Sequence, residues 1–169
     1  MKQFRTLFIA LALMIGATAF TNAQSKVAHI ATQDLVQSLP AYKSAMDQLE
    51  KLNKTYQAEI EDMTAEAQST FQRYESEAAT KTEEENQKRA TEIQSAQRRI
   101  QEHSANARQD LQKKENDLLR PVLEKVRTAI QKVARAKGYD YVLDSTTGTG
   151  VLLADGYDLM PDVKKELGI

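Results

Sequence analysis

The chain has 169 residues, of which 23 are basic and 24 acidic, and it contains no cysteine and no tryptophan. This near balance of charge offers no bulk attraction for nucleic acid, and the lack of cysteine excludes disulfides and thiol chemistry. Glycine and proline are scarce, at six and three residues, while 28% of the residues are charged. Few turn-forming residues in a charged chain favour long helices over a compact mixed domain.

The N-terminal segment has the pattern of a secretory signal peptide. Two basic side chains precede an apolar run over residues 7–20, and small residues lead to a predicted cleavage between Ala23 and Gln24. A membrane anchor is the alternative, but the run is shorter than the roughly 20 residues that a spanning helix needs. Removal of residues 1–23 leaves 146 residues and, because two basic side chains go with it, 21 basic and 24 acidic groups.

The mature chain opens with a short predicted strand. Residues 26–31 alternate in the way that favours β structure. Val27 and His29 would share one face of this strand, and Ala28 and Ile30 would share the other.

A very long helical span follows. Thr32 is expected to cap a short helical turn that ends at Leu39. Pro40 suits the first position of a helix, and the chain then has no glycine or proline before Pro121. Pro121 lies inside the second half of the span, where it removes one backbone hydrogen bond and is expected to kink the helix as a hinge.

Apolar and small residues recur along this span at steps of three, four and four. The first half carries Leu49, Leu52, Tyr56, Ile60, Met63, Ala67, Phe71, Tyr74 and Ala78. The second half carries Ile93, Ala96, Ile100, Ser104, Ala107, Leu111, Glu115, Leu118, Val122, Val126, Ala129 and Val133. Eleven residues over three turns predict a seam along nearly straight helices, and its small residues make the distal packing thin.

A break in this seam at residues 80–87 is interpreted as the tip of a helical hairpin. The break has no large apolar residue and holds three consecutive glutamates. Residues 41–79 contain four basic and eight acidic groups, and residues 88–137 contain thirteen and six. Oppositely charged helices attract when antiparallel, although each exposed pair contributes little. One continuous rod-like helix is the alternative.

The C-terminal part changes period. Gly138 can end the long helix, and residues 139–144 and 151–154 are predicted to form a β-hairpin. Asp158 is expected to cap a last short helix that reaches Leu167. The predicted fold is therefore mainly α with a small β part.

In this organisation residues 24–40 and 138–169 form a β-containing foot, and residues 41–137 form the hairpin arm with its tip near 80–87. One such foot has little apolar surface and open strand edges, which several copies could cover by joining their sheets.

The succession of a short strand, a segment ending at Pro40-Ala-Tyr42, two long helices and the sequence VARAKGYDYVLD at 133–144, with Pro121 upstream, resembles the Skp/OmpH family of periplasmic chaperones. The resemblance covers essentially the whole mature chain. It implies a periplasmic homotrimer with a β-barrel body formed by three chains. Helical arms would enclose a cavity that holds unfolded outer-membrane β-barrel proteins, without ATP or another cofactor.

The resemblance also implies two sets of site residues. Association would involve Val27, Ile30, Val142, Leu143, Val151 and Leu153. Client binding would involve the inner surfaces of the arms, where the seam aromatics and the basic residues of the return helix make Tyr56, Phe71, Tyr74, Arg98, Arg99 and Arg108 the candidates. The aromatic residues could instead serve only to pack the arms, and the arginines could be a solvated helix face. Known members are strongly basic, whereas this mature chain is slightly acidic, which argues against carrying over lipopolysaccharide as a partner.

No catalytic or metal-binding pattern is present in the sequence. His29 and His103 do not have metal-ligand spacing, and the glutamates at 83–85 are expected to be solvated. Residues 145–150 contain glycines but join two predicted strands, whereas a phosphate-binding loop opens a helix. The sequence therefore predicts a binding protein rather than an enzyme. The alternative function is a structural coiled-coil spacer or adaptor between cell-envelope components.

Overall fold

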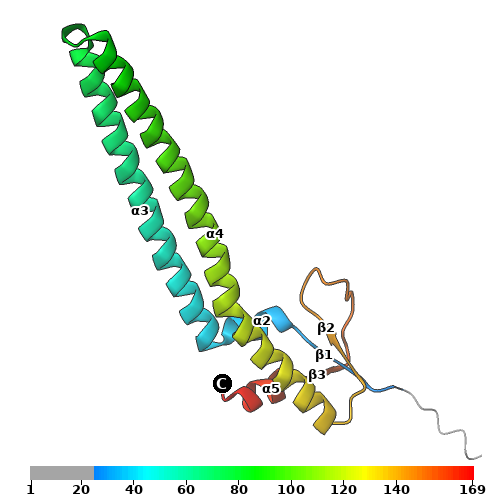
Figure 1. Cartoon of the computed structure of the whole chain (residues 1–169). Helices are drawn as coiled ribbons and strands as arrows, with labels where there is room; N and C mark the ends of the chain where they lie inside the picture. The colour runs from blue at the N-terminus through cyan, green and yellow to red at the C-terminus, as the bar shows by residue number, and fades with distance from the viewer. Residues whose placement is uncertain (1–24) are drawn as a thin grey trace, which may run out of the picture.

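The computed structural model describes residues 25–169, which form a long helical hairpin on a small foot (Figure 1). The predicted signal peptide and its cleavage site lie outside these residues. In chain order the elements are β1 (Val27–Ile30), α2 (Thr32–Ser38), α3 (Pro40–Glu77), η1 (Ala78–Thr80), α4 (Glu83–Ala136), β2 (Tyr141–Asp144), β3 (Tyr157–Asp158) and α5 (Met160–Leu167). The prediction of a mainly α fold with a small β part is confirmed. None of the described helices is long and apolar enough to cross a membrane.

The hairpin turns back slightly earlier than predicted. After α3, the 3-10 turn η1 leads to Thr82, whose hydroxyl accepts the backbone N–H of Glu85, while the Glu85 carboxylate accepts the N–H of Thr82. This reciprocal capping box starts α4 at Glu83, so the three glutamates belong to its first turn, where the helix dipole favours negative charge. The T-x-x-E pattern of residues 82–85 is the signal in the sequence that could have located this start.

The predicted seam runs along the facing sides of α3 and α4. Its members are half-buried or buried, apart from Phe71 and Glu115, which are exposed. Burial increases toward the foot, where Val122, Val126 and Val133 of α4 are buried. The helix α4 continues through Pro121 without interruption, so the role of this proline as a hinge stays a prediction.

The foot contains a three-stranded sheet in the order β2-β1-β3 with parallel pairing throughout. Parallel pairing of β1 and β2 is what the long α3–α4 crossover permits. The predicted hairpin with a second strand at 151–154 is wrong, because that segment is irregular and β2 pairs with β1. The third strand of the sheet is β3, on the other side of β1. Gly148 and Gly150, both with φ of 92°, turn the chain away from β2.

The ends of the helices are only partly as predicted. Gly138 follows the end of α4 with φ of 73°, in agreement with its expected role. Thr32 is the first residue of α2 and not its cap, since the N-cap position is Ala31. Asp158 lies two residues before α5, and its carboxylate accepts the backbone N–H of Met160 at 2.8 Å.

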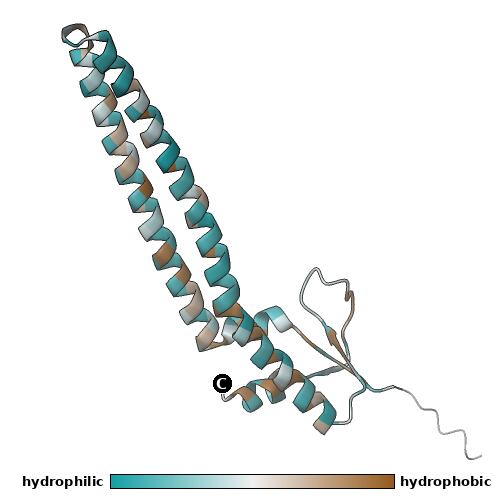
Figure 2. Cartoon of the chain, viewed as in Figure 1, coloured by the Kyte–Doolittle hydropathy of each residue, from teal (hydrophilic) through white to brown (hydrophobic). Residues whose placement is uncertain are grey.

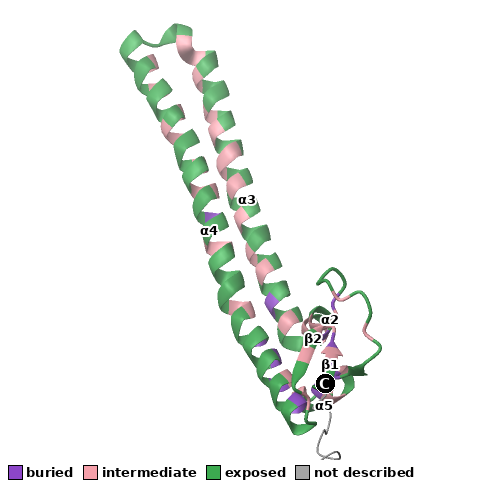
Figure 3. Cartoon of the chain, turned by 90° about the vertical axis from the view of Figure 1, so that its right-hand side faces the viewer, coloured by how far each residue is buried: buried purple, intermediate pink, exposed green. Residues whose placement is uncertain are grey.

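The apolar core lies at the junction of the foot and the base of the arm. Its fully buried side chains are Ile30, Leu35, Leu159 and Val163, and they pack with the buried residues of α4. Figure 3 shows this concentration of buried residues at the foot, whereas the distal arm is exposed or half-buried. The arm, about 57 Å long for a helix such as α3, therefore extends far beyond the core.

Candidate functional site

One face of the foot sheet is left uncovered by the helices. Side chains alternate along a strand, and β1 buries Ala28 and Ile30 under the helices while Val27 is exposed on the opposite face. The parallel register pairs Val27 with Tyr141, and Tyr141 is also exposed. The uncovered face is therefore apolar and aromatic, and we call it the open face (Val27, Tyr141 and Leu143).

The predicted association residues divide between the two faces of this sheet. Val27 and Leu143 lie on the open face and are exposed. Ile30 is 0% exposed and packs in the core of its own chain, so its part in association stays a prediction that exposure does not support. Val142 packs against the same core. Two neighbouring residues such as Val142 and Leu143 cannot share a face of one strand, and Tyr141, two residues before Leu143, was missed although this rule identifies it.

The loop between β2 and β3 carries the most exposed apolar side chains of the foot. Leu152 is 100% exposed and Leu153 is 77% exposed, while Val151 is half-buried. Figure 2 shows this hydrophobic stretch on the loop that arches away from the sheet. Leu152 was missed because a strand over 151–154 would have placed it opposite Val151 and Leu153.

Both ends of this loop are tied to His29 of β1. The Nδ1 atom of His29 lies 3.0 Å from the Ser145 hydroxyl, and Nε2 lies 3.2 Å from the Gly156 carbonyl. Since a carbonyl only accepts, Nε2 carries the proton and Nδ1 accepts from Ser145. His29 therefore has a structural role, and it fixes where an exposed apolar loop leaves and rejoins the sheet.

The carboxylate of Asp144 organises the start of the same loop. It accepts the backbone N–H of Thr146 at 2.9 Å and the Thr146 hydroxyl at 2.6 Å, and it also accepts two hydrogen bonds from Thr32. Burial opposes ionisation of Asp144, but the hydrogen bonds from the two threonines outweigh it and lower the pKa to about 2.

An open groove with a cavity volume of about 710 Å³ is lined by residues of α2, α4 and β2 beside the core. Its walls include Val36, Tyr42, Ile130 and Val142, with Arg127 and Arg135 also lining it. Leu123 lines the groove and is exposed. The foot of one chain thus leaves apolar surface open on both sides of its sheet.

Midway along the arm, Tyr56 faces α4. Its hydroxyl donates to Asp110 at 2.9 Å, and its ring meets that of His103 edge to face at 6.1 Å. His103 in turn lies 2.9 Å from the Glu59 carboxylate. The hydrogen bond to Asp110 and burial raise the pKa of Tyr56, so its hydroxyl stays protonated and joins the two helices.

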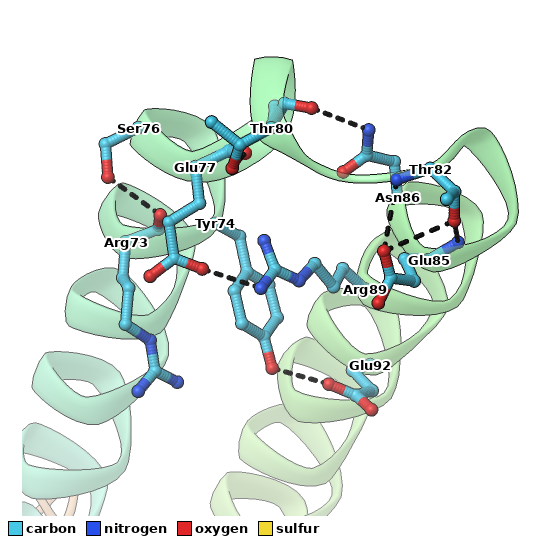
Figure 4. A network of polar contacts seen from close by, with 11 residues as sticks. Arg73, Tyr74, Ser76, Glu77, Thr80, Thr82, Glu85, Asn86, Arg89 and Glu92 are labelled. Atoms are coloured by element: carbon cyan, nitrogen blue, oxygen red, sulfur yellow. Dashed lines mark hydrogen bonds and ion pairs between the residues drawn. The ribbon is translucent and has the colours of Figure 1, made fainter.

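Tyr74 is likewise engaged with the opposite helix. Its hydroxyl donates to Glu92 at 2.6 Å, and the Arg89 guanidinium lies 4.5 Å from its ring centroid (Figure 4). Two of the predicted client-binding residues, Tyr56 and Tyr74, therefore use their hydroxyl groups in hydrogen bonds within the arm. Of the three predicted aromatic residues, Phe71 alone is mainly exposed, at 52%.

The predicted client-binding arginines are exposed on α4. Arg98, Arg99 and Arg108 make no ion pair within 4 Å to any described residue. Between the arms, Arg89–Glu77 is the only salt bridge of residues 25–169 that does not involve a histidine, and His103 also lies beside Glu59. The expected attraction between the arms thus involves few direct contacts, and most of the positive charge on α4 faces solvent.

The structure does not gather these residues into one pocket. Phe71 lines a notch of about 430 Å³ near the tip, and Arg99 lines a neighbouring groove of about 770 Å³. The two hollows share Tyr74 and Ile93. Within residues 25–169 no group of three or more acidic or histidine side chains is placed to hold a metal ion. The arrangement provides a long surface of separate apolar and cationic contacts.

Comparisons with known proteins agree with this architecture. The chain is 24% identical over 157 residues to the chaperone protein Skp of Pectobacterium atrosepticum, covering 93% of this chain and 94% of the relative. It is 28% identical over 137 residues to the chaperone protein Skp of Photorhabdus laumondii, covering 81% of each. A solved structure described as a putative outer membrane chaperone (OmpH-like) from Caulobacter crescentus has the same fold, with a TM-score of 0.74, 19% identity and coverage of 86% and 85%.

The family described as outer membrane protein (OmpH-like) matches residues 26–167, which include every described helix and strand of the foot and both helices of the arm. The chain therefore belongs to the OmpH-like family.

Proposed function

We propose that the chain is an ATP-independent holdase of the periplasm that binds unfolded outer-membrane β-barrel proteins and prevents their aggregation before insertion. The observation that carries the proposal is the arm, which extends far from the core with no buried side chain between Ala45 and Ala107. The names of the relatives, chaperone protein Skp, support the same function. They also agree with the expectation that the chain is not an enzyme.

The arm offers an unfolded chain many weak contacts. Phe71 presents an exposed aromatic ring, and Arg98, Arg99 and Arg108 present unpaired positive charges to solvent. Apolar burial contributes about 25 cal/mol per Å² in proportion to the area buried, whichever side chains are involved. Many small contacts can therefore add up without any one of them being specific. Release then needs no nucleotide, because individually weak contacts exchange readily when a client finds a better place to fold.

Self-association is the second part of the proposal, with three copies suggested by the family resemblance. The open face, the exposed loop around Leu152 and the outer edges of β2 and β3 are surfaces that an isolated chain would leave in water. Exposed strand edges and apolar patches mark places where further chains add. In a closed ring of copies each arm would project from a shared body and would border a common cavity.

A refolding experiment tests the holdase function. A denatured outer-membrane β-barrel protein is diluted into buffer with or without the purified mature chain, and aggregation is followed by light scattering. We expect stoichiometric amounts of the chain to suppress aggregation in the absence of ATP. Unchanged aggregation at a stoichiometric ratio would reject the function.

The alternative, a structural spacer between envelope components, requires an arm that keeps a fixed shape. The half-buried seam and the small residues of the distal arm, such as Ala67 and Ala96, argue against a stiff spacer. Capture from envelope extracts separates the two functions, because a spacer would retain one dominant folded partner and a holdase would retain a range of barrel proteins.

A further inference from the structure

The distal end of the arm is closed by polar side chains instead of apolar packing. Tyr74 and Glu77 of α3 meet Arg89 and Glu92 of α4 just below the turn, as Figure 4 shows. We call these four residues the tip clasp. The residues of the clasp and of its neighbouring turns are half-buried or exposed, unlike the buried core of the foot. The clasp therefore has to hold the helices together by directional contacts.

Arg89 is the centre of the clasp. Its Nη2 atom lies 2.6 Å from the Glu77 carboxylate, and its guanidinium lies 4.5 Å from the ring centroid of Tyr74. The Tyr74 hydroxyl donates to Glu92 at 2.6 Å. Each of these three contacts joins α3 to α4, and together they leave the Arg89 side chain only 18% exposed at the far end of the molecule.

The turn itself places Arg89 correctly for these contacts. The capping box of Thr82 and Glu85 fixes the first turn of α4, and the side-chain amide of Asn86 donates to the carbonyl of Ala78 at 3.0 Å. Arg89 follows Asn86 by three residues and therefore lies on the same side of α4. The turn thus places the backbone of Arg89 on the side of α4 from which its side chain reaches Glu77 and Tyr74.

One atom of the clasp makes it cooperative. The Nη1 atom of Arg89 is buried and has no hydrogen-bond partner among the described residues. A buried donor without a partner is costly, so the buried position of Arg89 persists only while the contacts to Glu77 and Tyr74 offset that cost. Loss of either partner should release the arginine to water, and the other contacts would then be lost with it.

We propose that the tip clasp keeps α3 and α4 together at their distal end, so that the arm bends as a pair of helices and does not open from the tip. This conformational device follows from the contacts within one chain. It is independent of the proposed function, because the helices would stay paired with or without a client.

Hydrogen exchange measured by mass spectrometry on the mature protein tests the device. In Arg89→Met, which keeps an unbranched side chain but removes the charge, we expect exchange of the amides in residues 70–95 to be about tenfold faster. The amides of the foot should be unchanged. Arg98→Met is the matched control, since Arg98 is exposed on the same helix, and it should leave exchange at the tip unchanged. Equal exchange in Arg89→Met and the unaltered protein would overturn the proposal.

Cooperativity has its own test. Tyr74→Leu removes the aromatic ring, and the double variant with Arg89→Met removes both sides of the cation–π contact. If the clasp acts as a unit, exchange at the tip in the double variant will be close to that of either single variant. If the acceleration of exchange in the double variant equals the product of the accelerations in the two single variants, the contacts are independent. That result would overturn the clasp as a cooperative device.

Discussion

The carboxylate of Asp144 accepts hydrogen bonds from both the backbone N–H and the hydroxyl of Thr32, a residue 112 positions earlier in the chain. The N-cap residue of α2 is Ala31, whose side chain cannot accept a hydrogen bond. Asp144 therefore supplies, from the end of β2, the acceptor that a helix start ordinarily finds in its own cap. The same carboxylate binds Thr146, so it joins β2, α2 and the start of the exposed loop.

Replacement of this carboxylate should destabilise the foot. Asp144→Asn keeps the size of the side chain but loses the charge that strengthens its hydrogen bonds with Thr32 and Thr146, and we expect a loss of about 2 kcal/mol. Chemical denaturation at fixed protein concentration, followed by tyrosine fluorescence, measures the change. Asp155→Asn is the control, since Asp155 is exposed on the far end of the same loop, and it should be neutral. Equal stability of both variants would contradict the role of Asp144.

The pKa of Asp144 makes a separate prediction for acid. Because its folded pKa, about 2, lies below the ordinary value of 3.8, ionised Asp144 stabilises the folded state at pH values above about 4. That contribution is lost as the pH falls from about 4 to about 2. Denaturation of the unaltered protein and of Asp144→Asn at several pH values should show their difference in stability shrinking over this window. A difference that stays constant down to pH 2 would contradict the assignment.

The exposed loop provides the prediction for assembly. Leu153→Asp places a charge on an apolar side chain that is 77% exposed in one chain, so it should leave the isolated fold intact but release monomers by burying a charge at the interface between copies. Light scattering with mass determination measures the result. Phe71→Asp is the matched control, since Phe71 is exposed on the distal arm. It should retain the assembled mass, and an unchanged mass in Leu153→Asp would count against association through this loop.

The arm was largely predictable from the sequence because local patterns determine it. The signals for the helices are the scarcity of glycine and proline, the position of Pro40 at a helix start and the eleven-residue seam. Each of them depends on residues within a few helical turns. The position of the tip was misjudged because the three glutamates were interpreted as loop, although Thr82 and Glu85 form a capping box. A negative first turn favours a helix start.

The foot was less predictable because its contacts are distant in sequence. The alternation of side chains along β1 correctly placed Val27 and Ile30 on opposite faces of the strand. It could not tell which of the two faces α4 would cover. The 151–154 segment has a strand-like sequence but is irregular, and the sheet takes β3, at Tyr157–Asp158, as its third strand on the other side of β1. The acceptor that Asp144 provides to Thr32 has no local signal at all, since it depends on parallel pairing across the whole arm.

Charge on the outer side of α4 leads to the last prediction. Arg98, Arg99 and Arg108 are exposed and make no ion pair with a described residue, so they are free to attract a negatively charged segment of a client. Substitution of all three with glutamine should weaken binding of an acidic denatured barrel protein at low salt. The Debye length falls from about 30 Å at 0.01 M to about 10 Å at 0.1 M ionic strength, so the difference from the unaltered protein should diminish as salt is added. Titrations of a fluorescently labelled client at the two salt concentrations measure both effects.

Phe71→Ser serves as the comparison, because loss of an apolar contact should weaken binding to a similar extent at both concentrations. If the triple variant bound as well as the unaltered protein at low salt, the positive charge of α4 would have no part in holding clients, and the apolar contacts alone would have to account for the proposed function.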